Sequence, residues 1–352
     1  MGRHTLALTW LARRLDVDRD QVLRVLVYHR VRIPGQAWRG DPDVLSADVE
    51  ALDVQMAYLV RHYVPVTGSQ VAAALHGQAP LPWHAVLVTF DDGYRDFLEA
   101  AWPVLKRHGV PAVLFVPTAF PGTQTAFWWD ELHELVSGTA ADEVVAFGLG
   151  RLPLRTPLDR SRAVRALNRF LKALPPDELS ERLQALRRSL GPVDTSDWWV
   201  LSWDELRRLA ADGLAVGSHT RTHAALPSLA LERLEGEIRG ADEDLRRELG
   251  GGALLFAFPY GMADPRAVPV LRELGYAAAF GLRLGRNVLG RGDPFAMFRH
   301  SVDWGDSLTR TAFSLSTGFV GLYEAGRAAK RCVTGWLVPR PSGAGGEVPR
   351  TT

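Results

Sequence analysis

The chain has 352 residues, of which 47% are hydrophobic and 23% are charged. These values are typical of a globular protein with one large domain or two modest ones. Lys and Arg total 41 and Asp and Glu total 40, so a net charge of +1 provides no global field to attract nucleic acid, and we expect no nucleic-acid partner. The single cysteine, Cys332, rules out an internal disulfide.

The N-terminal apolar stretch TLALTWLA is followed by RRLDVDRD and lacks a small-residue cleavage pattern. It is a poor signal peptide and is too short to span a bilayer. We therefore expect a cytoplasmic protein. A position at the membrane surface stays open because of the C-terminal segment described below.

Apolar runs typical of strands alternate with helical patterns along the chain. Strands are predicted at 22–31, 85–90, 112–116, 214–218, 254–258 and 276–280. Helices are predicted at 46–62, with Ser46 as a plausible N-cap, and at 94–108, 203–211 and 229–249. Buried strands joined by helices indicate an α/β fold with a mainly parallel sheet, either open or closed into a barrel. In such folds, reactive side chains gather at the carboxyl ends of the strands.

Two stretches depart from this alternation. From about 121 to 200 the sequence contains FWWDELHELV, two Arg- and Leu-rich helical patterns and DTSDWWVLSW, and the strand pattern resumes at 214. We predict a helical insertion within one domain that covers 1–307. For 308–352 we predict an amphipathic helix and a disordered tail. The helix either packs on the domain or makes a peripheral contact with an anionic membrane.

Chemically reactive side chains follow two of the predicted strands. AVLVTF is followed by Asp91 and Asp92, two like charges that repel each other when adjacent. LAVGS is followed by His219, and His223 comes four residues later. If the chain turns helical there, both imidazoles lie on one face, within reach of a single metal ion. Two His and one carboxylate are a common metal-binding set in hydrolases, and the second carboxylate could then take a proton from water.

A third strand end carries a sharp turn. LLFAF runs into Pro259, Tyr260 and Gly261, and such a turn can point the backbone N–H of Tyr260 at a developing oxyanion. An ordinary Pro/Gly turn is the alternative interpretation.

The stretches TFDDGY, HTRTH and FPYG, in this order, resemble motifs one to three of the NodB-type polysaccharide deacetylases, the fourth carbohydrate esterase family. VLVYHRV, FWWDEL and SWDELRRLAADGLAVGSHTRTH are similar to bacterial members that are often found with exopolysaccharide genes. The resemblance covers about residues 22–305. It implies a distorted (β/α) barrel with fewer strands than the usual eight, and metal-dependent removal of N-acetyl groups from an amino-sugar glycan.

The resemblance also implies roles for individual residues. Asp91 would be the general base, and the Tyr260 amide would help to bind the oxyanion. Asp92, His219 and His223 would bind a divalent metal, for which zinc is expected, although cobalt, nickel or iron would also fit.

Two departures from the family pattern affect these roles. The third motif commonly has an arginine that holds the catalytic Asp, but Ala257 stands there in this chain. FRHSVD offers Arg299 either as the displaced partner of Asp91 or as a surface arginine. The family's general acid, a later histidine, has no clean match, and His300 and His29 are the candidates for this role. His29 is also a candidate substrate-binding residue at the same rim.

Pro259 is a further candidate for substrate binding, and the tryptophans of the insertion either stack on sugars or pack the insertion against the body.

Three functions remain open. An active deacetylase is favoured because the base and the metal ligands are intact. The others are a weak or inactive carbohydrate-binding relative, suggested by Ala257 and the missing general acid, and a hydrolase of a non-sugar amide.

Overall fold

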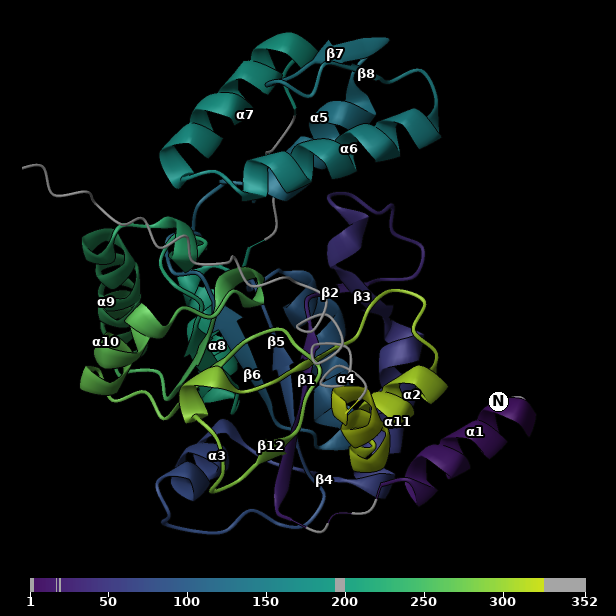
Figure 1. The fold of residues 1–352 in the computed structure, drawn as a ribbon, viewed down its shortest axis with the longest axis vertical. Coiled ribbons are helices and arrows are strands. Elements are labelled where there is room, and N and C mark those ends of the chain that lie inside the picture. The colour runs from purple at the N-terminus through teal and green to yellow at the C-terminus, as the bar shows by residue number, and fades with distance from the viewer. Residues whose placement is uncertain (1–2, 17, 19, 194–199, 326–352) are drawn as a thin grey trace, which may run out of the picture.

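The computed structural model describes residues 3–16, 18, 20–193 and 200–325. The central sheet runs in the order β11-β10-β9-β6-β5-β1-β12, and β4 and β13 pair with β5 and β1 (Figure 1). The strands are β1 (Val22–Tyr28), β4 (Val64–Pro65), β5 (Ala85–Phe90), β6 (Ala112–Val116), β9 (Ala215–Ser218), β10 (Leu255–Ala257), β11 (Ala278–Phe280), β12 (Asn287–Val288) and β13 (His300–Ser301). Among these pairings only β1 with β12 is antiparallel. The predicted parallel sheet is confirmed.

The central strands are buried on both faces, which explains their continuous apolar sequences. Every residue of β1, β5 and β6 is buried. Side chains of one face fill the barrel interior, and those of the other pack under the surrounding helices.

A late segment closes the sheet. Met297 bridges to Phe280 of β11, and its carbonyl accepts a hydrogen bond from Gly281 N at 2.9 Å. Three residues further on, His300 pairs in register with Leu26 of β1. Residues 297–301 thus span the gap between β11 and β1. They complete a distorted barrel whose strands are β1, β5, β6, β9, β10, β11 and β13, as the family resemblance implied.

The helices around the barrel are α2 (Val49–His62), α3 (Gly68–Leu75), α4 (Trp102–His108), α8 (Trp203–Ala211), α9 (Leu231–Leu249) and α10 (Val268–Glu273). Two predicted helix starts were wrong. Asp48, not Ser46, caps α2, because its side chain accepts a hydrogen bond from Ala51 N at 2.8 Å, and Ser46 lies in β3 (Leu45–Asp48). A π-helical turn at Phe97–Ala101 precedes α4, so the α-helix begins later than predicted.

The insertion forms a separate layer at the top of Figure 1. It consists of α5 (Trp128–Gly138), β7 (Glu143–Val145), β8 (Arg151–Pro153), α6 (Pro157–Lys172) and α7 (Pro176–Leu190). Its three helices bury their own cluster of leucines, which includes Leu132, Leu135, Leu167 and Leu186. The antiparallel pair β7 and β8 was not predicted from the sequence.

A short loop ties the insertion to the barrel. The loop follows β2 (Arg30–Arg32), and in it Gly40 N donates to Glu134 at 2.8 Å and Asp41 N donates to Asp130 at 2.7 Å. Gly40 has φ +86°, and a Cβ there would lie 2.4 Å from the Asp130 carboxylate. Only glycine fits both this backbone conformation and this close approach.

Both chain ends contribute helices. α1 (Arg3–Arg14) precedes the barrel, and α11 (Leu308–Leu315) buries Ala312 and Leu315. The helical segment at 308–315 thus packs on the body, whereas the predicted tail beyond residue 325 lies outside the described residues. No helix in the described ranges combines the length and apolarity that a bilayer span requires.

Candidate active site

The residues singled out by the motifs meet in one cavity of about 280 Å³ at the carboxyl ends of the strands. Asp91 and Asp92 follow β5, His219 follows β9, and Tyr260 follows β10. The cavity wall contains all four, together with His29, His223 and Arg299. The sheet thus gathers residues that are far apart in the sequence.

Backbone in the left-handed region directs several of these side chains. Of the six non-glycine residues with positive φ in the described ranges, four lie here: Asp92 (75°), Thr220 (64°), His223 (58°) and Tyr260 (58°). This region costs a non-glycine residue on the order of 1–3 kcal/mol, and such residues cluster at functional sites. The placement of these side chains therefore lowers the stability of the fold.

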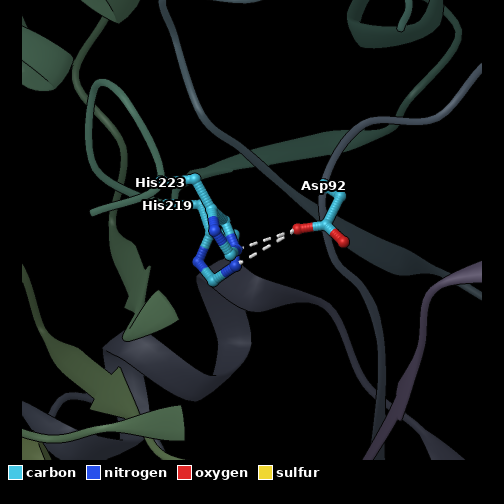
Figure 2. A group of neighbouring side chains, drawn as sticks. All are labelled: Asp92, His219 and His223. Atoms are coloured by element: carbon cyan, nitrogen blue, oxygen red, sulfur yellow. Dashed lines mark ion pairs between the residues drawn. The ribbon is translucent and has the colours of Figure 1, made fainter. Parts of the chain in front are cut away.

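Asp92, His219 and His223 form a compact group (Figure 2). The Nε2 atoms of His223 and His219 lie 3.2 and 3.5 Å from Asp92 Oδ1. The predicted helical turn between the two histidines is absent, because residues 219–223 form an irregular loop. The left-handed backbone at Thr220 and His223 brings the two imidazoles together instead, with ring centroids 4.8 Å apart.

The chemistry of this group fits a divalent cation. The Ala257 carbonyl lies 2.7 Å from His219 Nδ1, so the proton is held on Nδ1 and the Nε2 lone pair faces Asp92. Burial lowers the pKa of His219 to about 4, which keeps the imidazole neutral. Burial raises the pKa of Asp92, but the neighbouring His223, His29 and His219 together outweigh it and the pKa is lowered. Asp92 Oδ1 is buried and receives no hydrogen bond from any described residue. Two imidazole nitrogens and one unsatisfied carboxylate oxygen are a suitable ligand set for zinc.

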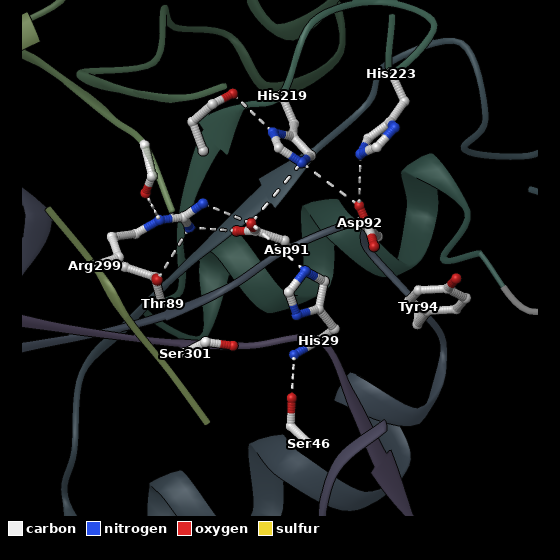
Figure 3. Close-up of polar contacts among 12 residues, drawn as sticks. His29, Ser46, Thr89, Asp91, Asp92, Tyr94, His219, His223, Arg299 and Ser301 are labelled. Carbon is white, nitrogen blue, oxygen red and sulfur yellow. Dashed lines mark hydrogen bonds and ion pairs between the residues drawn. The ribbon is translucent and has the colours of Figure 1, made fainter. Parts of the chain in front are cut away.

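Arg299 lies against Asp91 in the barrel interior (Figure 3). Its two terminal nitrogens donate to the two carboxylate oxygens at 2.7 and 2.8 Å, and its Nε donates to the Gly281 carbonyl at 3.1 Å. The guanidinium side chain is 0% exposed. Burial raises the pKa of Asp91, but the charge and hydrogen bonds of Arg299, with His219 and His29, together outweigh it and the pKa lies below its usual value. Asp91 is therefore held ionised and in a fixed orientation.

His29 and His300, the two candidates for the general acid, lie in different surroundings. His29 lines the cavity, is 22% exposed, and has its Nε2 4.0 Å from Asp91 Oδ2. His300 is buried outside the cavity wall, with its Nε2 3.1 Å from the Gly285 carbonyl, and burial lowers its pKa to about 4. Pro259 is also buried and is not part of the described wall. Of these three residues, only His29 is in the cavity.

The insertion contributes to the cavity wall, which the sequence did not predict in detail. Trp128 and Trp129 come from α5, and Asn168 and Lys172 come from α6. Trp129 is 4% exposed and stacks on Phe127, with ring centroids 4.6 Å apart. Trp128 is half-buried and lines the cavity. Both tryptophans thus line the site, and Trp129 also packs the insertion against the body.

Further residues of the wall were not predicted as site residues: Asp41, Asp43, Val44, Ser46, Gly261, Leu282, Ser301 and Asp303. The first three come from the β2–β3 connection, and Ser46 lies in β3. Gly261 follows β10, Leu282 follows β11, Ser301 lies in β13 and Asp303 follows it. Gly261 lies in FPYG, and Ser301 and Asp303 lie in FRHSVD, but the other residues lie in no motif, so only the tertiary structure identifies them.

The fold and this group of side chains define a NodB-type barrel. A sequence profile of the polysaccharide deacetylase family matches residues 79–141 and 187–279, two segments separated by most of the insertion. The two matched segments carry the motif residues described above, Asp91 and Asp92 in the first and His219, His223 and Tyr260 in the second.

A curated relative points the same way. The poly-beta-1,6-N-acetyl-D-glucosamine N-deacetylase of Escherichia coli strain K12 is 28% identical over 274 residues, which cover 70% of this chain and 32% of that protein. The chain thus spans about a third of the length of this relative. A protein of the same name from Escherichia coli O157:H7 matches over the same length and identity.

Solved structures share the fold. IcaB from Ammonifex degensii has a TM-score of 0.54 and 21% identity, covering 84% of this chain and 97% of its own. The Streptococcus pyogenes deacetylase PplD, solved in complex with acetate, has a TM-score of 0.54 and 15% identity, covering 84% of this chain and 99% of its own. These similarities establish the barrel architecture.

Proposed function

We propose that this protein removes N-acetyl groups from amino-sugar residues of a polysaccharide or oligosaccharide. The single observation that carries the proposal is that Asp91, held by Arg299, and the Asp92–His219–His223 group share one cavity. A fixed carboxylate base beside a metal site is an arrangement that can hydrolyse an amide. The family match and the names of the relatives support the same reaction.

Asp91 is the proposed general base. Oδ2 is the oxygen that faces the other polar groups of the site, since it lies 3.9 Å from His219 Nε2 and 4.0 Å from His29 Nε2. Arg299 occupies one lone pair of each carboxylate oxygen, and a carboxylate has about four acceptor positions. A lone pair on Oδ2 therefore remains to accept a proton from water.

Asp92, His219 and His223 would hold the divalent cation. When bound, such an ion supplies Lewis-acid polarisation of the acetyl carbonyl and makes water easier to deprotonate. The left-handed turn at Tyr260 supports a role of its backbone N–H as the donor to the developing oxyanion.

His29 is the proposed general acid that protonates the leaving amine. It is partly exposed to the cavity and lies beside Asp91, so it can reach a group bound between them. Its backbone N–H donates to Ser46 Oγ at 2.9 Å, which fixes the start of the side chain. His300 lacks this access because it is buried outside the wall.

The proposal is tested by acetate release from N-acetylglucosamine oligomers, with the protein stripped of metal and then supplied with zinc, cobalt or nickel. We expect release that depends on the added metal. Tight metal binding without release from either β-1,4- or β-1,6-linked oligomers would favour a carbohydrate-binding protein, and release from a simple non-sugar acetamide alone would favour a different amide.

A further inference from the structure

A second cavity adjoins the catalytic one, between the loop at 41–43 and the insertion. Its volume is about 420 Å³, which is within the roughly 300–1,000 Å³ of typical ligand sites. Asp41 and Asp43 line both cavities, so the two share a wall. On its far side the second cavity is lined by α5 and α6, which contribute His133, Ser161 and Arg165 among others.

The shared wall is held on both sides. Asp41 N donates to Asp130 of α5, and Asp41 Oδ2 accepts a hydrogen bond from Asn168 of α6 at 3.2 Å. Asp41 Oδ1 accepts from Asp43 N at 3.0 Å. Because the wall is bonded to the insertion, the two cavities adjoin in a fixed position relative to each other.

The lining of the second cavity offers hydrogen-bonding groups that the protein itself does not use. In the described part of the chain, the side chains of Asp43 and Arg165 have no hydrogen-bond or ion-pair partner, and both residues are exposed. His133 Nδ1 is buried without a partner, although its Nε2 lies 3.2 Å from Ser137 Oγ. The lining thus offers a carboxylate acceptor, a guanidinium donor and an imidazole nitrogen. This mixture suits ligand groups that both donate and accept, such as hydroxyl and amide groups, better than a ligand with a single charge.

We propose that this second cavity is a subsite for a neighbouring sugar of the same glycan, so that the preferred substrate is a chain of N-acetylated sugars rather than a single one. This inference rests on the proposed deacetylase function, since it places the reacting sugar in the catalytic cavity. The insertion then has a role in substrate selection: its α6 forms one wall of the subsite.

The test compares Ser161→Trp, which fills the subsite, with Arg162→Trp, which adds the same bulk at an exposed neighbouring position outside both cavities. Acetate release is measured on β-1,4- and β-1,6-linked N-acetylglucosamine oligomers of two and six residues. We expect kcat/KM of the wild type and of Arg162→Trp to rise about tenfold from dimer to hexamer, the change that about 1.4 kcal/mol of added binding gives. Ser161→Trp should lose this rise. Equal ratios in the two variants, or no rise in the wild type, would overturn the subsite.

Hexamer binding, measured by calorimetry in an Asp91→Asn background, separates the two proposals. We expect Ser161→Trp, but not Arg162→Trp, to weaken binding by about tenfold. If this pattern holds while the wild type releases no acetate, the subsite stands and the deacetylase function is wrong. If hexamers of neither linkage bind, or if Ser161→Trp binds them as tightly as Arg162→Trp does, the subsite is wrong whatever the activity.

Discussion

The indole N–H of Trp128 donates a hydrogen bond to the hydroxyl of Tyr260 at 2.9 Å. The two residues come from α5 of the insertion and from the turn after β10. The ammonium of Lys172 on α6 lies 4.4 Å from the centre of the same tyrosine ring, and partial burial lowers the pKa of this lysine. The insertion thus holds the side chain of the residue whose left-handed backbone would present the oxyanion donor.

Replacement of Trp128 by Phe should therefore lower kcat. The lost hydrogen bond is worth about 1 kcal/mol, so we expect a decrease of about three- to tenfold. Zinc stoichiometry should stay unchanged, because no metal-ligand candidate is altered. The matched control is Trp83→Phe, at a tryptophan that is 56% exposed and outside the cavity wall. An unaltered kcat in Trp128→Phe would mean that the bond to Tyr260 does not position the turn.

The proposed roles of Asp91 and His219 separate metal binding from proton transfer. Asp91→Asn should retain zinc and lose about 10²- to 10⁴-fold in kcat, the usual contribution of a general base. His219→Ala removes a ligand and should lose both zinc and activity. Zinc content by mass spectrometry and acetate release check both variants. Equal zinc loss in the two would contradict the assignment.

Arg299→Ala leaves the Asp91 carboxylate buried without its partner. Breaking such a buried pair costs about 3–5 kcal/mol, so the variant should be markedly less stable and slower, with its zinc content unchanged. Adding Asp91→Asn to Arg299→Ala removes the unpaired charge and should restore part of the lost stability. Urea unfolding of the two single variants and the double variant measures this. Additive losses would show that the pair does not act as a unit.

His29→Gln tests the proposed general acid by comparing two substrates, one whose leaving group needs a proton and one whose leaving group does not. An amine must be protonated to leave, whereas a nitrophenolate leaves without a proton. We expect His29→Gln to lower kcat on an N-acetylated oligomer by about 10²-fold and to change kcat on 4-nitrophenyl acetate little. His300→Gln serves for comparison, because its side chain lies outside the cavity wall. Equal losses on amide and ester would contradict the role.

Asp130 gives a pH dependence of stability that is independent of the metal group. It is 0% exposed, and burial raises its pKa to about 7, although Arg30 and the hydrogen bond from Tyr94 at 2.6 Å oppose this. The side chain of Asp in an unfolded chain has a pKa of about 3.9. The stabilisation from its bound proton is therefore complete below pH 4 and is lost as the pH rises through about 7.

Asp130→Asn does not titrate, so it should gain about 2 kcal/mol relative to the wild type between pH 5 and pH 8. Urea unfolding of metal-free protein at both pH values measures the difference. A difference that is constant with pH would mean that Asp130 is ionised throughout.

The sequence predicted the barrel strands well because a strand that is buried on both faces needs a continuous apolar run. All six predicted strands are present, and four of the site residues follow directly from motifs at their ends: Asp91, Asp92, His219 and Tyr260. The roles assigned to them, the cytoplasmic location and the membrane contact stay predictions.

What the sequence did not predict depends on contacts that are distant along the chain. β13 has only two residues, too few for a periodic pattern, yet it sets which side chains enter the barrel. Successive residues of a strand point to opposite faces, so Arg299 and Ser301 line the cavity while His300 does not. Alternation in FRHSVD would have separated Arg299 from His300 had the strand been recognised. Lys172 and Trp128 reach the site only because the insertion docks there.

The strand that closes the barrel also has a consequence for how the protein folds during its synthesis. Asp91 and Arg299 are 208 positions apart, and the imidazole nitrogens of His29 and His219 lie farther from the Asp91 carboxylate, at 4.0 and 3.9 Å. During synthesis, Asp91 and Asp92 lie side by side without this partner until residue 299 has left the ribosome and docked. A nascent or C-terminally clipped chain that ends before Arg299 therefore lacks both the last strand of the barrel and the partner that orders Asp91, so we expect such incomplete molecules to lack the proposed activity.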